Sequence, residues 1–279
     1  MITPKLDLPI GVFDSGVGGL TVLRALYDML PQESYLYLGD TARVPYGIKS
    51  PETITRYAEQ AASTLIKRGI KLLVVACNTV TAVCLKHLQE VYVDLPIIGV
   101  VEPGAKAAVR ASVTGHIAVI GTEATVNAQS YQRAIRQLRN DTNIIAQSCG
   151  LLVALAEEGW TDDTIAEATV RRYLEPILHS PANGAVDCLV LGCTHYPAFL
   201  PVIKNVVGDR MHIVDSAKTT AEMTAELMQL KNLAIEKDQA DLPRMNFLVT
   251  DSPLRFSRTA KQFLGWEIPD SSITMIDFH

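Results

Sequence analysis

The sequence predicts an α/β protein built from two similar domains, each with a mainly parallel sheet flanked by helices. Short apolar runs typical of buried strands alternate with segments of helical periodicity along most of the 279 residues. In addition, residues 74–82 and residues 190–198 share one pattern: an apolar run, a small residue, a cysteine and then small polar side chains. We therefore expect two domains related by pseudo-two-fold symmetry, with the functional site in the cleft between them.

In the first half of the chain, strands and helices are expected in regular alternation. Pro31 ends the first helix. Ser50 is the expected N-cap of the second helix because Pro51 takes its first position, and Gly69 ends that helix. The expected strands are residues 9–13, 35–38, 72–76 and 96–100, and the expected helices are residues 19–30, 51–68, 79–91 and 102–112.

The second half continues this alternation. Residues 10–16 and residues 117–122 each contain a strand that ends in small polar residues, so the internal repeat extends beyond the two cysteines. The expected strands are residues 117–120, 144–147 and 186–191, and the expected helices are residues 125–139, 151–158 and 163–178. Repeated βα units of this kind predict a parallel sheet with helices on both faces.

The end of the chain is expected to return to the first sheet. Residues 231–245 are polar and poorly periodic, which predicts a surface excursion, and residues 246–250 and 254–264 resemble one more strand and helix. We therefore expect the first domain to comprise residues 1–99 plus about 211–279, and the second domain to comprise residues from about 100 to 210.

Composition and charge exclude several classes of function. The chain is 48% hydrophobic and 20% charged, which is typical of a globular protein with a substantial core, and its formal net charge is −5. Because no Lys/Arg cluster is long enough to follow a phosphate backbone, we expect no nucleic acid partner. The first nine residues lack the apolar core of a signal peptide, and no apolar run reaches the length of a membrane span. We therefore expect a cytoplasmic protein without membrane contact.

The five cysteines fall into two groups. Their odd number and the absence of CxxC spacing predict free thiols rather than a disulfide framework. Cys84, Cys149 and Cys188 are expected to be buried structural residues. Cys77 and Cys193 differ because each lies just past a strand, beside polar residues and near a helix start. A helix N-terminus favours the thiolate, so we expect these two thiols to have pKa values below the usual value of about 8.5.

Two thiols that face one another across a cleft can exchange a proton at carbon. One thiolate removes a proton from a stereocentre while the opposite thiol delivers a proton to the other face, and the reverse reaction exchanges their roles. Backbone amides beyond the strand ends can stabilise the carbanion. Cys77 and Cys193 are therefore the expected catalytic pair, and they should titrate as a coupled system.

Other polar residues follow the same strand ends. Asp14 and Ser15 lie in a glycine-rich turn that lacks both the lysine of a P-loop and the spacing of a dinucleotide fingerprint, so they are expected to hold an ammonium group or orient a thiol. Asp40 also follows a strand and should lie near the same rim. His195, two residues after Cys193, can set the protonation of that cysteine or of the substrate.

Two further uses of Cys193 and His195 are disfavoured. A Cys–His peptidase is not expected, because no papain-type local signature surrounds either cysteine. A zinc site is not expected, because Cys193 and His195 lack a second ligand pair at suitable spacing. We therefore expect no metal at this site.

Six motifs together resemble the glutamate racemase family of the cofactor-independent aspartate/glutamate racemase superfamily. They are FDSGVGG at residues 13–19, LGDTARVPYG at 38–47, VVACNTVTA at 74–82, GVVEPGA at 99–105, VIGTEATV at 119–126 and LGCTHYP at 191–197. Residues 247–265 fit the same pattern, so the resemblance covers nearly the whole chain. It implies interconversion of L- and D-glutamate without a cofactor or a metal, which supplies D-glutamate for bacterial peptidoglycan.

The resemblance also implies roles for individual residues. Cys77 and Cys193 become the catalytic acid/base thiols. Glu157 becomes the helper of Cys193, and Asp14, with Asp40 as a second candidate, the helper of Cys77. His195 is implied both as a catalytic residue and as a substrate contact. The remaining implied substrate contacts are Asp14, Ser15, Tyr46, Gly47, Asn78, Thr79, Thr122, Thr125 and Thr194.

Two alternatives stay open at this stage. The Cys-Asn-Thr and Cys-Thr-His motifs are shared across relatives, so a racemase of aspartate or of another small acidic substrate is one alternative. The other, from a different class, is a two-lobed amino-acid-binding protein without catalysis. The sequence leaves the oligomeric state open, and a homodimer is one candidate.

Overall fold

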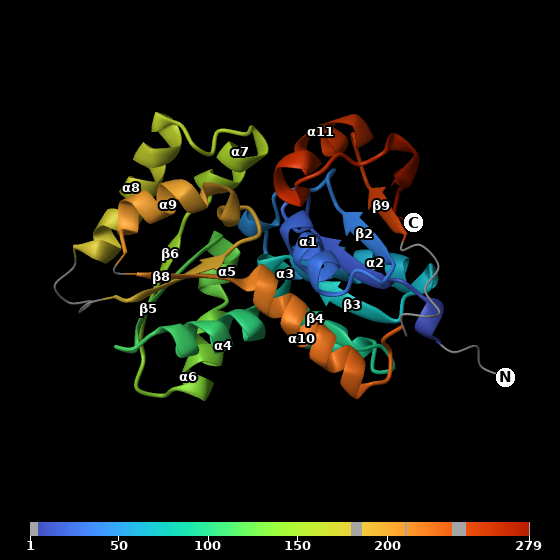
Figure 1. Cartoon of the computed structure of the whole chain (residues 1–279), viewed down its shortest axis with the longest axis horizontal. Helices are drawn as coiled ribbons and strands as arrows, with labels where there is room; N and C mark the ends of the chain where they lie inside the picture. Colours follow the sequence, from blue (N-terminus) through green and yellow to red (C-terminus); the bar gives the residue numbers. More distant parts are fainter. Residues whose placement is uncertain (1–4, 180–185, 210, 236–243, 279) are drawn as a thin grey trace.

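The computed structural model describes residues 5–179, 186–209, 211–235 and 244–278. These residues form two parallel sheets with helices on both faces of each (Figure 1). The predicted fold class is therefore confirmed.

The first sheet is six-stranded in the described residues, with the strand order β10-β9-β2-β1-β3-β4. Every pairing in it is parallel. In chain order, its strands are β1 (Ile10–Asp14), β2 (Tyr35–Gly39), β3 (Leu72–Val75), β4 (Ile97–Gly99), β9 (Met245–Val249) and β10 (Ile273–Met275). β9 pairs with β2, so the end of the chain returns to the first sheet as predicted.

The second sheet has the order β6-β5-β7-β8, again with parallel pairings. Its strands are β5 (His116–Gly121), β6 (Asn143–Ser148), β7 (Cys188–Gly192) and β8 (His212–Asp215). The order β6-β5-β7-β8 repeats β2-β1-β3-β4 of the first sheet strand for strand. In both sheets the order in which successive strands are added reverses beside the first strand of the set, and α/β proteins place ligands at such a point.

One strand departs from the expected domain boundary. Residues 212–215 fall in the range assigned to the first domain, yet as β8 they pair with β7 in the second sheet. Parallel pairing with β7 buries the backbone polar groups of this short segment, and no sequence pattern marks that partner. The division into two domains itself stays a prediction.

The helices of the described residues connect these strands. They are α1 (Leu20–Met29), α2 (Pro51–Lys67), α3 (Asn78–Val91), α4 (Val101–Ala111), α5 (Glu123–Asn127), α6 (Ser130–Leu138), α7 (Leu151–Glu157), α8 (Thr164–Leu178), α9 (Leu200–Val207), α10 (Ser216–Leu230) and α11 (Pro253–Leu264). Short 3-10 helices occupy Lys5–Asp7, Tyr46–Ile48, Tyr196–Phe199 and Asp270–Ser272. The elements α9, β8, α10 and β10 were not predicted. The predicted excursion at residues 231–245 lies partly outside the described residues.

The start and end of α2 follow the local sequence. Ser50 is the N-cap and accepts a hydrogen bond from the backbone N–H of Thr53 at 3.3 Å, while Pro51 occupies the first turn. Gly69 takes a positive φ of 79° just after the helix ends. Glycine adopts this left-handed conformation without steric cost, so the predicted boundaries are confirmed.

The single helix predicted at residues 125–139 is wrong, because the segment is divided into α5 and α6. Gln129 lies between them with a φ of 52°, which no helix interior allows. The break is held by a contact with another segment, because the Ser130 hydroxyl donates to the carbonyl of Ala82 at 2.6 Å. The turn redirects α6 so that Tyr131 reaches α3.

The central strands are buried on both faces. In the first sheet, Val12 and Val74 belong to one apolar cluster, while their neighbours Phe13 and Val75 belong to another on the opposite face. Both faces are covered by helices, so these strands are continuous apolar runs rather than alternating ones. The first cluster extends to Ile120 and other residues of the second sheet, so one core spans the two halves.

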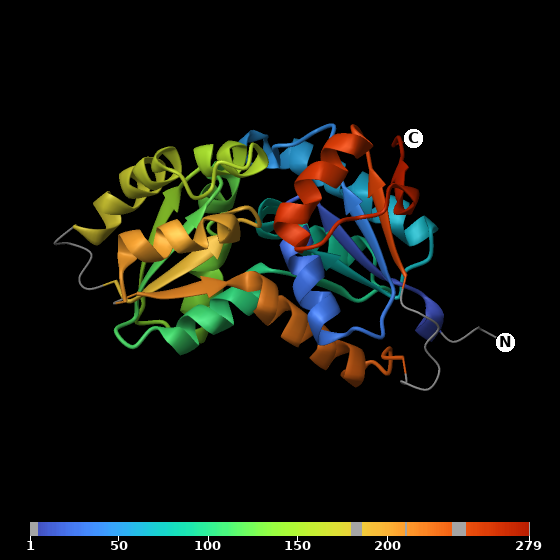
Figure 2. The same ribbon diagram turned by 45° about the horizontal axis from the view of Figure 1, so that its top comes forward.

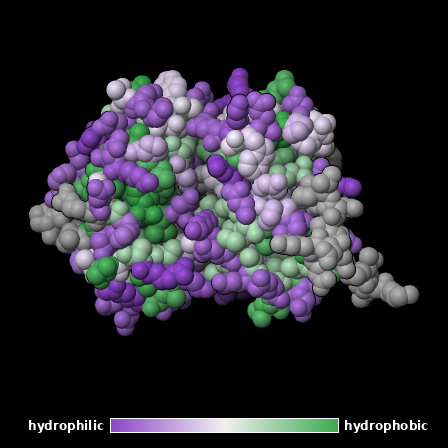
Figure 3. All heavy atoms as spheres, in the orientation of Figure 1, coloured by the Kyte–Doolittle hydropathy of each residue, from purple (hydrophilic) through white to green (hydrophobic). Residues whose placement is uncertain are grey.

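Helix α10 also joins the halves, because it packs against α1 of the first half and α4 of the second (Figure 2). On the face drawn in Figure 3, hydrophilic residues predominate and hydrophobic ones form smaller groups. Within the part of the chain that the structure describes, we find no helix with the length and apolar character needed to cross a membrane.

Candidate active site

The two cysteines of the repeated motif occupy equivalent positions at the ends of β3 and β7. Cys77 is the N-cap of α3, and its carbonyl accepts a hydrogen bond from the N–H of Thr81 at 2.9 Å. Cys193 precedes a 3-10 helix instead, and its carbonyl accepts from the N–H of Tyr196 at 3.2 Å. Both side chains are buried, with exposed fractions of 4% and 6%. All five cysteines lie in the described residues and are free thiols.

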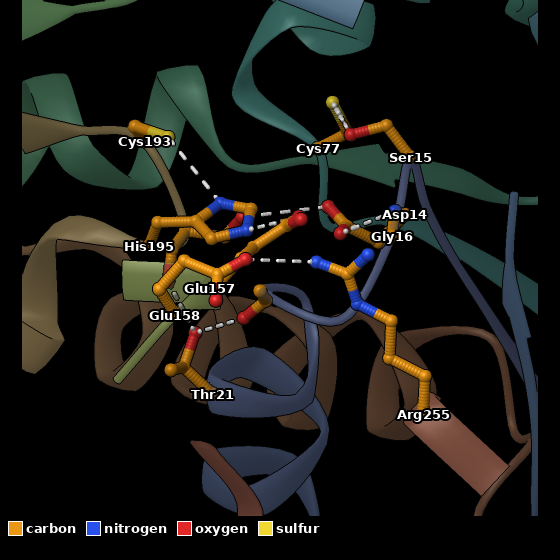
Figure 4. A network of polar contacts seen from close by, with 12 residues as sticks. Asp14, Ser15, Gly16, Thr21, Cys77, Glu157, Glu158, Cys193, His195 and Arg255 are labelled. Atoms are coloured by element: carbon orange, nitrogen blue, oxygen red, sulfur yellow. Dashed lines mark hydrogen bonds and ion pairs between the residues drawn. The ribbon is translucent and has the colours of Figure 1, made fainter. Parts of the chain in front are cut away.

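Cys77 lies in an acidic, dry environment. Its thiol donates to the Ser15 hydroxyl at 3.5 Å (Figure 4), and Asp14 beside it is completely buried. Burial raises the pKa of Cys77 to about 12, and the negative charge of Asp14 adds to this effect. The expectation of a lowered pKa is therefore wrong for Cys77. Ser15 and the N–H of Val80 lower the pKa, but by less than burial raises it.

Asp14 links the two loops that carry the site. Its carboxylate accepts from the N–H of Gly16 at 3.0 Å and from the hydroxyl of Thr194 at 3.5 Å. Burial raises its pKa, and the opposing charge of His195 and three backbone N–H groups only partly offset that rise. Asp14 therefore lies within electrostatic reach of both cysteine loops.

Cys193 begins a chain of polar contacts that runs through His195 to Glu157 (Figure 4). Its Sγ is 3.8 Å from His195 Nδ1, and His195 Nε2 is 3.2 Å from Glu157 Oε1. Burial lowers the pKa of His195, but its hydrogen bonds with Cys193 and Glu157 outweigh burial and raise it to about 10. At neutral pH His195 is therefore an imidazolium, with one ring N–H directed at Cys193 and the other at Glu157.

The predicted effect of His195 on stability follows from this raised pKa. An unfolded histidine loses its proton near pH 6.5, whereas native His195 keeps it up to about pH 10. The unfolded cysteine keeps its own proton up to about pH 8.5, which compensates for a thiolate at native Cys193. The free energy of unfolding should therefore fall with rising pH between about pH 8.5 and 10, with the Cys193–His195 pair contributing up to about 1.4 kcal/mol per pH unit. His195→Asn should show a shallower fall, measured by urea unfolding at several pH values. Equal slopes for the two proteins would contradict the assignment of a charged His195.

Asp40 contacts residues around the site and not the catalytic cysteines. Its carboxylate accepts from the Tyr46 hydroxyl and, at 2.8 Å, from the Thr250 hydroxyl, and it forms an ion pair with Arg43 at 2.5 Å. These contacts engage both oxygens, so Asp40 positions the loop of Tyr46 instead of contacting Cys77. Burial, followed by the charge of Asp40, raises the pKa of Tyr46 well above its usual value and keeps the phenol protonated.

Hydroxyl groups from both halves meet beside Cys77. Thr79 Oγ1 is 2.9 Å from Thr122 Oγ1 and 3.5 Å from Thr125 Oγ1, and the latter two are 3.0 Å apart. Gly47 packs against the same group, because a Cβ at this position would lie 2.4 Å from Thr122 Cβ. Thr79 and Gly47 come from the first half and the other two from the second, so this cluster forms only when the halves are closed together.

Asn78 has one hydrogen-bonded and one free end. Its Oδ1 accepts from the Tyr131 hydroxyl at 2.6 Å. Its Nδ2 has no hydrogen-bond partner among the described residues, although the side chain is only 2% exposed. A buried donor without a partner is costly, so Nδ2 marks a place where a ligand can supply an acceptor.

The structure brings the predicted site residues into one buried region between the halves. Two residues of that region were missed in the sequence analysis. Gly18 permits close contact between its loop and the loop of Cys193, because a Cβ there would lie 2.4 Å from Thr194 Oγ1 and 2.7 Å from His195 Nδ1. Its place in the FDSGVGG motif is a signal that could have found it. Tyr131 carries no such signal.

No group of three or more His, Cys, Asp or Glu side chains within residues 5–179, 186–209, 211–235 and 244–278 is arranged to hold a metal ion. A cavity of about 100 Å³ adjoins the site on the side of Glu157, where Gly16, Val44 and Arg255 help to line it. Nearby, Arg255 of α11 pairs with Glu158, which follows α7, at 3.3 Å, so the halves also touch at this rim (Figure 4).

These features define a class of protein: two repeated α/β halves that enclose a pair of opposed thiols, each with its own polar partners. The sequence profile of the Asp/Glu/hydantoin racemase family matches residues 10–224. A glutamate racemase of Syntrophus aciditrophicus is 47% identical over 267 residues, which cover 96% of each chain. The chain therefore belongs to the Asp/Glu/hydantoin racemase family.

Solved structures agree with this assignment. The glutamate racemase RacE1 of Bacillus anthracis matches with a TM-score of 0.90 and 35% identity, covering 98% of each chain. A glutamate racemase of Francisella tularensis in complex with D-glutamate matches with a TM-score of 0.89 and 33% identity, also over 98% of each chain. The resemblance to the aspartate/glutamate racemases is thereby confirmed.

Proposed function

We propose that this protein is a glutamate racemase that interconverts L- and D-glutamate with two thiols and without a cofactor, and so supplies D-glutamate for peptidoglycan. The observation that carries the proposal is the pair of buried thiols at equivalent strand ends, Cys77 beside Asp14 and Ser15, and Cys193 beside His195. The bound D-glutamate of the similar Francisella protein supports the choice of substrate.

In one direction Cys193 is the base. Its thiolate removes the α-proton, so the Cα–H bond breaks, an S–H bond forms, and the electron pair stays on the α-carbon and is delocalised into the carboxylate. Cys77 then gives its thiol proton to the opposite face of that carbon and becomes a thiolate. The reverse direction exchanges the two roles. The charged His195 beside Cys193 and the raised pKa of Cys77 support this assignment of the initial base and acid.

Cys193 and Cys77 have different polar partners, which supports different initial roles for the two thiols. Glu157 holds His195 against Cys193, while Asp14 and Ser15 accompany Cys77. A substrate ammonium bound beside Asp14 would place a positive charge near Cys77 and lower the pKa of its thiol. Cys77 can then also act as a base once substrate is bound.

The substrate carboxylates require hydrogen-bond donors. Asn78 Nδ2 and the first N–H groups of α3 form an anion-binding end, because a helix N-terminus carries partial positive charge and unpaired donors. The hydroxyls of Thr79, Thr122 and Thr125 gather beside it, and the Thr194 hydroxyl lies against Asp14. Tyr46 and Gly47 complete the proposed binding site. Because both thiols are nearly inaccessible, we propose that the halves separate to admit the substrate.

The proposal is tested by incubating the protein with L-glutamate in deuterium oxide. We expect the circular dichroism signal to decay to zero while deuterium accumulates at the α-carbon. Absence of both changes would exclude racemisation of glutamate. A parallel incubation with L-aspartate separates the two acidic substrates, and ligand binding without exchange would indicate the non-catalytic alternative.

A cytoplasmic location also remains a proposal, and five free thiols are consistent with a reducing compartment. The homodimer stays a prediction.

A further inference from the structure

Arg43 lies against the faces of two aromatic rings that come from distant parts of the chain. Its guanidinium carbon is 3.9 Å from the centroid of the Tyr57 ring in α2 and 4.2 Å from that of Phe278, which follows β10. A guanidinium within about 6 Å of a ring face is attracted to the π electrons. The side chain of Arg43 is 20% exposed, so solvent screens this attraction only in part.

The polar edge of the same guanidinium holds Asp40 and Gln60. Arg43 Nε donates to Asp40 Oδ2 at 2.5 Å, and Nη1 donates to Gln60 Oε1 at 2.6 Å. The planar guanidinium makes both bonds with its edge while its faces stay free for stacking, which a lysine ammonium cannot reproduce. Arg43 therefore fixes the buried Asp40, while the two rings hold Arg43 itself.

Two of the groups that contact Arg43 also contact Tyr46. Asp40 Oδ2 accepts from the Tyr46 hydroxyl, and the ring of Tyr57 packs against the ring of Tyr46 with the centroids 5.5 Å apart. The hydroxyl and the ring of Tyr46 are therefore held by two groups that meet at Arg43.

The position of Tyr46 in turn determines where Gly47 lies. The two residues begin the short helix Tyr46–Ile48, and a Cβ at Gly47 would lie 2.4 Å from Thr122 Cβ in the other half. Thr122 belongs to the hydroxyl cluster beside Cys77, so a shift of Tyr46 would also displace the segment that closes on this cluster. Displacements of about 1 Å in such a segment are enough to weaken the binding of a small ligand.

We propose that Arg43 is a positioning residue, itself held by the ring of Phe278, that keeps Tyr46 and Gly47 in the geometry that binds substrate. The inference rests on the proposed function, because it takes Tyr46 and Gly47 as substrate contacts. Arg43 acts on this segment through Asp40 and not on the thiols. Its loss should therefore weaken the binding of substrate and of transition state alike, which raises KM and leaves kcat nearly unchanged.

The test compares three side chains at position 278. Steady-state racemisation of glutamate is measured for the wild type, Phe278→Leu and Phe278→Tyr. Leucine keeps the apolar bulk but has no π face, so Phe278→Leu should raise KM about threefold and leave kcat within about twofold of the wild type. Tyrosine keeps the ring, so Phe278→Tyr should match the wild type. A purely structural defect would instead lower the fraction of active protein, and so kcat, without raising KM.

Arg43→Lys tests the centre of the same network. It keeps a positive charge beside Asp40 but loses the planar stacking and the separate bond to Gln60, so KM should rise about tenfold. Arg56→Lys is the matched control, because the Arg56 guanidinium lies 5.3 Å from the centroid of the same Tyr57 ring on the exposed side of α2. This control should leave KM at the wild-type value.

The double variant shows whether Phe278 acts through Arg43. Adding Phe278→Leu to Arg43→Lys should leave KM at the value of Arg43→Lys alone, because the planar cation that the ring holds is already gone. A wild-type KM in Phe278→Leu or Arg43→Lys, an equal rise in Phe278→Tyr or in Arg56→Lys, or increases that multiply in the double variant would overturn the inference. Failure of the proposed function has a different signature: the wild type itself would not exchange the α-proton of glutamate.

Discussion

Replacing either Cys77 or Cys193 by serine should abolish full racemisation, with kcat lowered by roughly 10³-fold or more. A serine hydroxyl is far less acidic than a thiol, so it can neither hold the negative charge of the base nor return a proton at a useful rate. In the proposed mechanism each cysteine acts on a different face of the α-carbon, and no other thiol takes its place. Cys84, Cys149 and Cys188 are buried on other segments of the fold.

The two serine variants should differ in what they retain. With one thiol intact, each variant can still remove the α-proton from one enantiomer of glutamate and exchange it, while the opposite enantiomer is inert. The measurement follows deuterium incorporation by nuclear magnetic resonance separately for L- and D-glutamate. The Cys84→Ser variant is the control and should racemise glutamate normally, because the thiol that it changes is hydrogen-bonded to the Val80 carbonyl. Racemisation at the wild-type rate by either Cys77→Ser or Cys193→Ser would refute the two-thiol mechanism.

The second large effect is expected from Gly18→Ala, which should lower kcat/KM about 10²-fold. The added Cβ would lie 2.4 Å from Thr194 Oγ1 and 2.7 Å from His195 Nδ1. Thr194 can rotate, but His195 is held between Cys193 and Glu157. Its ring also packs edge-on against the ring of Phe263, with the two ring centroids 5.5 Å apart. Relief of the clash therefore moves the imidazole away from Cys193, in addition to a stability loss of about 1–3 kcal/mol.

Gly150→Ala is the matched control for Gly18→Ala. A Cβ at Gly150 meets nothing within 4 Å, and its φ of −57° suits alanine. This variant should retain wild-type kcat/KM and stability. Steady-state kinetics of all three proteins, with thermal unfolding to confirm folding, provide the comparison. Normal kcat/KM in a folded Gly18→Ala protein would show that the close contact of the two loops is not needed for catalysis.

Much of the architecture could be predicted from local sequence. The cap at Ser50, the turn at Gly69 and the continuous apolar run of β3 depend on neighbours in the chain, and their predictions agree with the structure. The strand–cysteine repeat has the same local basis, because a strand that ends in small polar residues delivers them to the edge of a parallel sheet. The motifs shared with racemases then identified the other expected site residues around this repeat.

Features that depend on distant partners could not be predicted in this way. The break at Gln129 arises from contacts of α6 with α3, and β8 joins the second sheet by pairing with β7. The amide oxygen of Asn78 accepts from the hydroxyl of Tyr131, which lies on α6, a helix remote in sequence. None of these partners is marked by periodicity or spacing, so local patterns could not reveal them.

The sequence by itself determined that the chain folds as repeated βα units and that Cys77 and Cys193 occupy equivalent strand ends. Only the tertiary structure decided which groups surround each thiol. The helix end at Cys77 predicted a lowered pKa, yet complete burial beside Asp14 raises it to about 12. Cys193 instead lies against an imidazolium held by Glu157. Burial and charge are set by residues that only folding brings together, and in the proposed mechanism they distinguish the thiol that begins as the acid from the one that begins as the base.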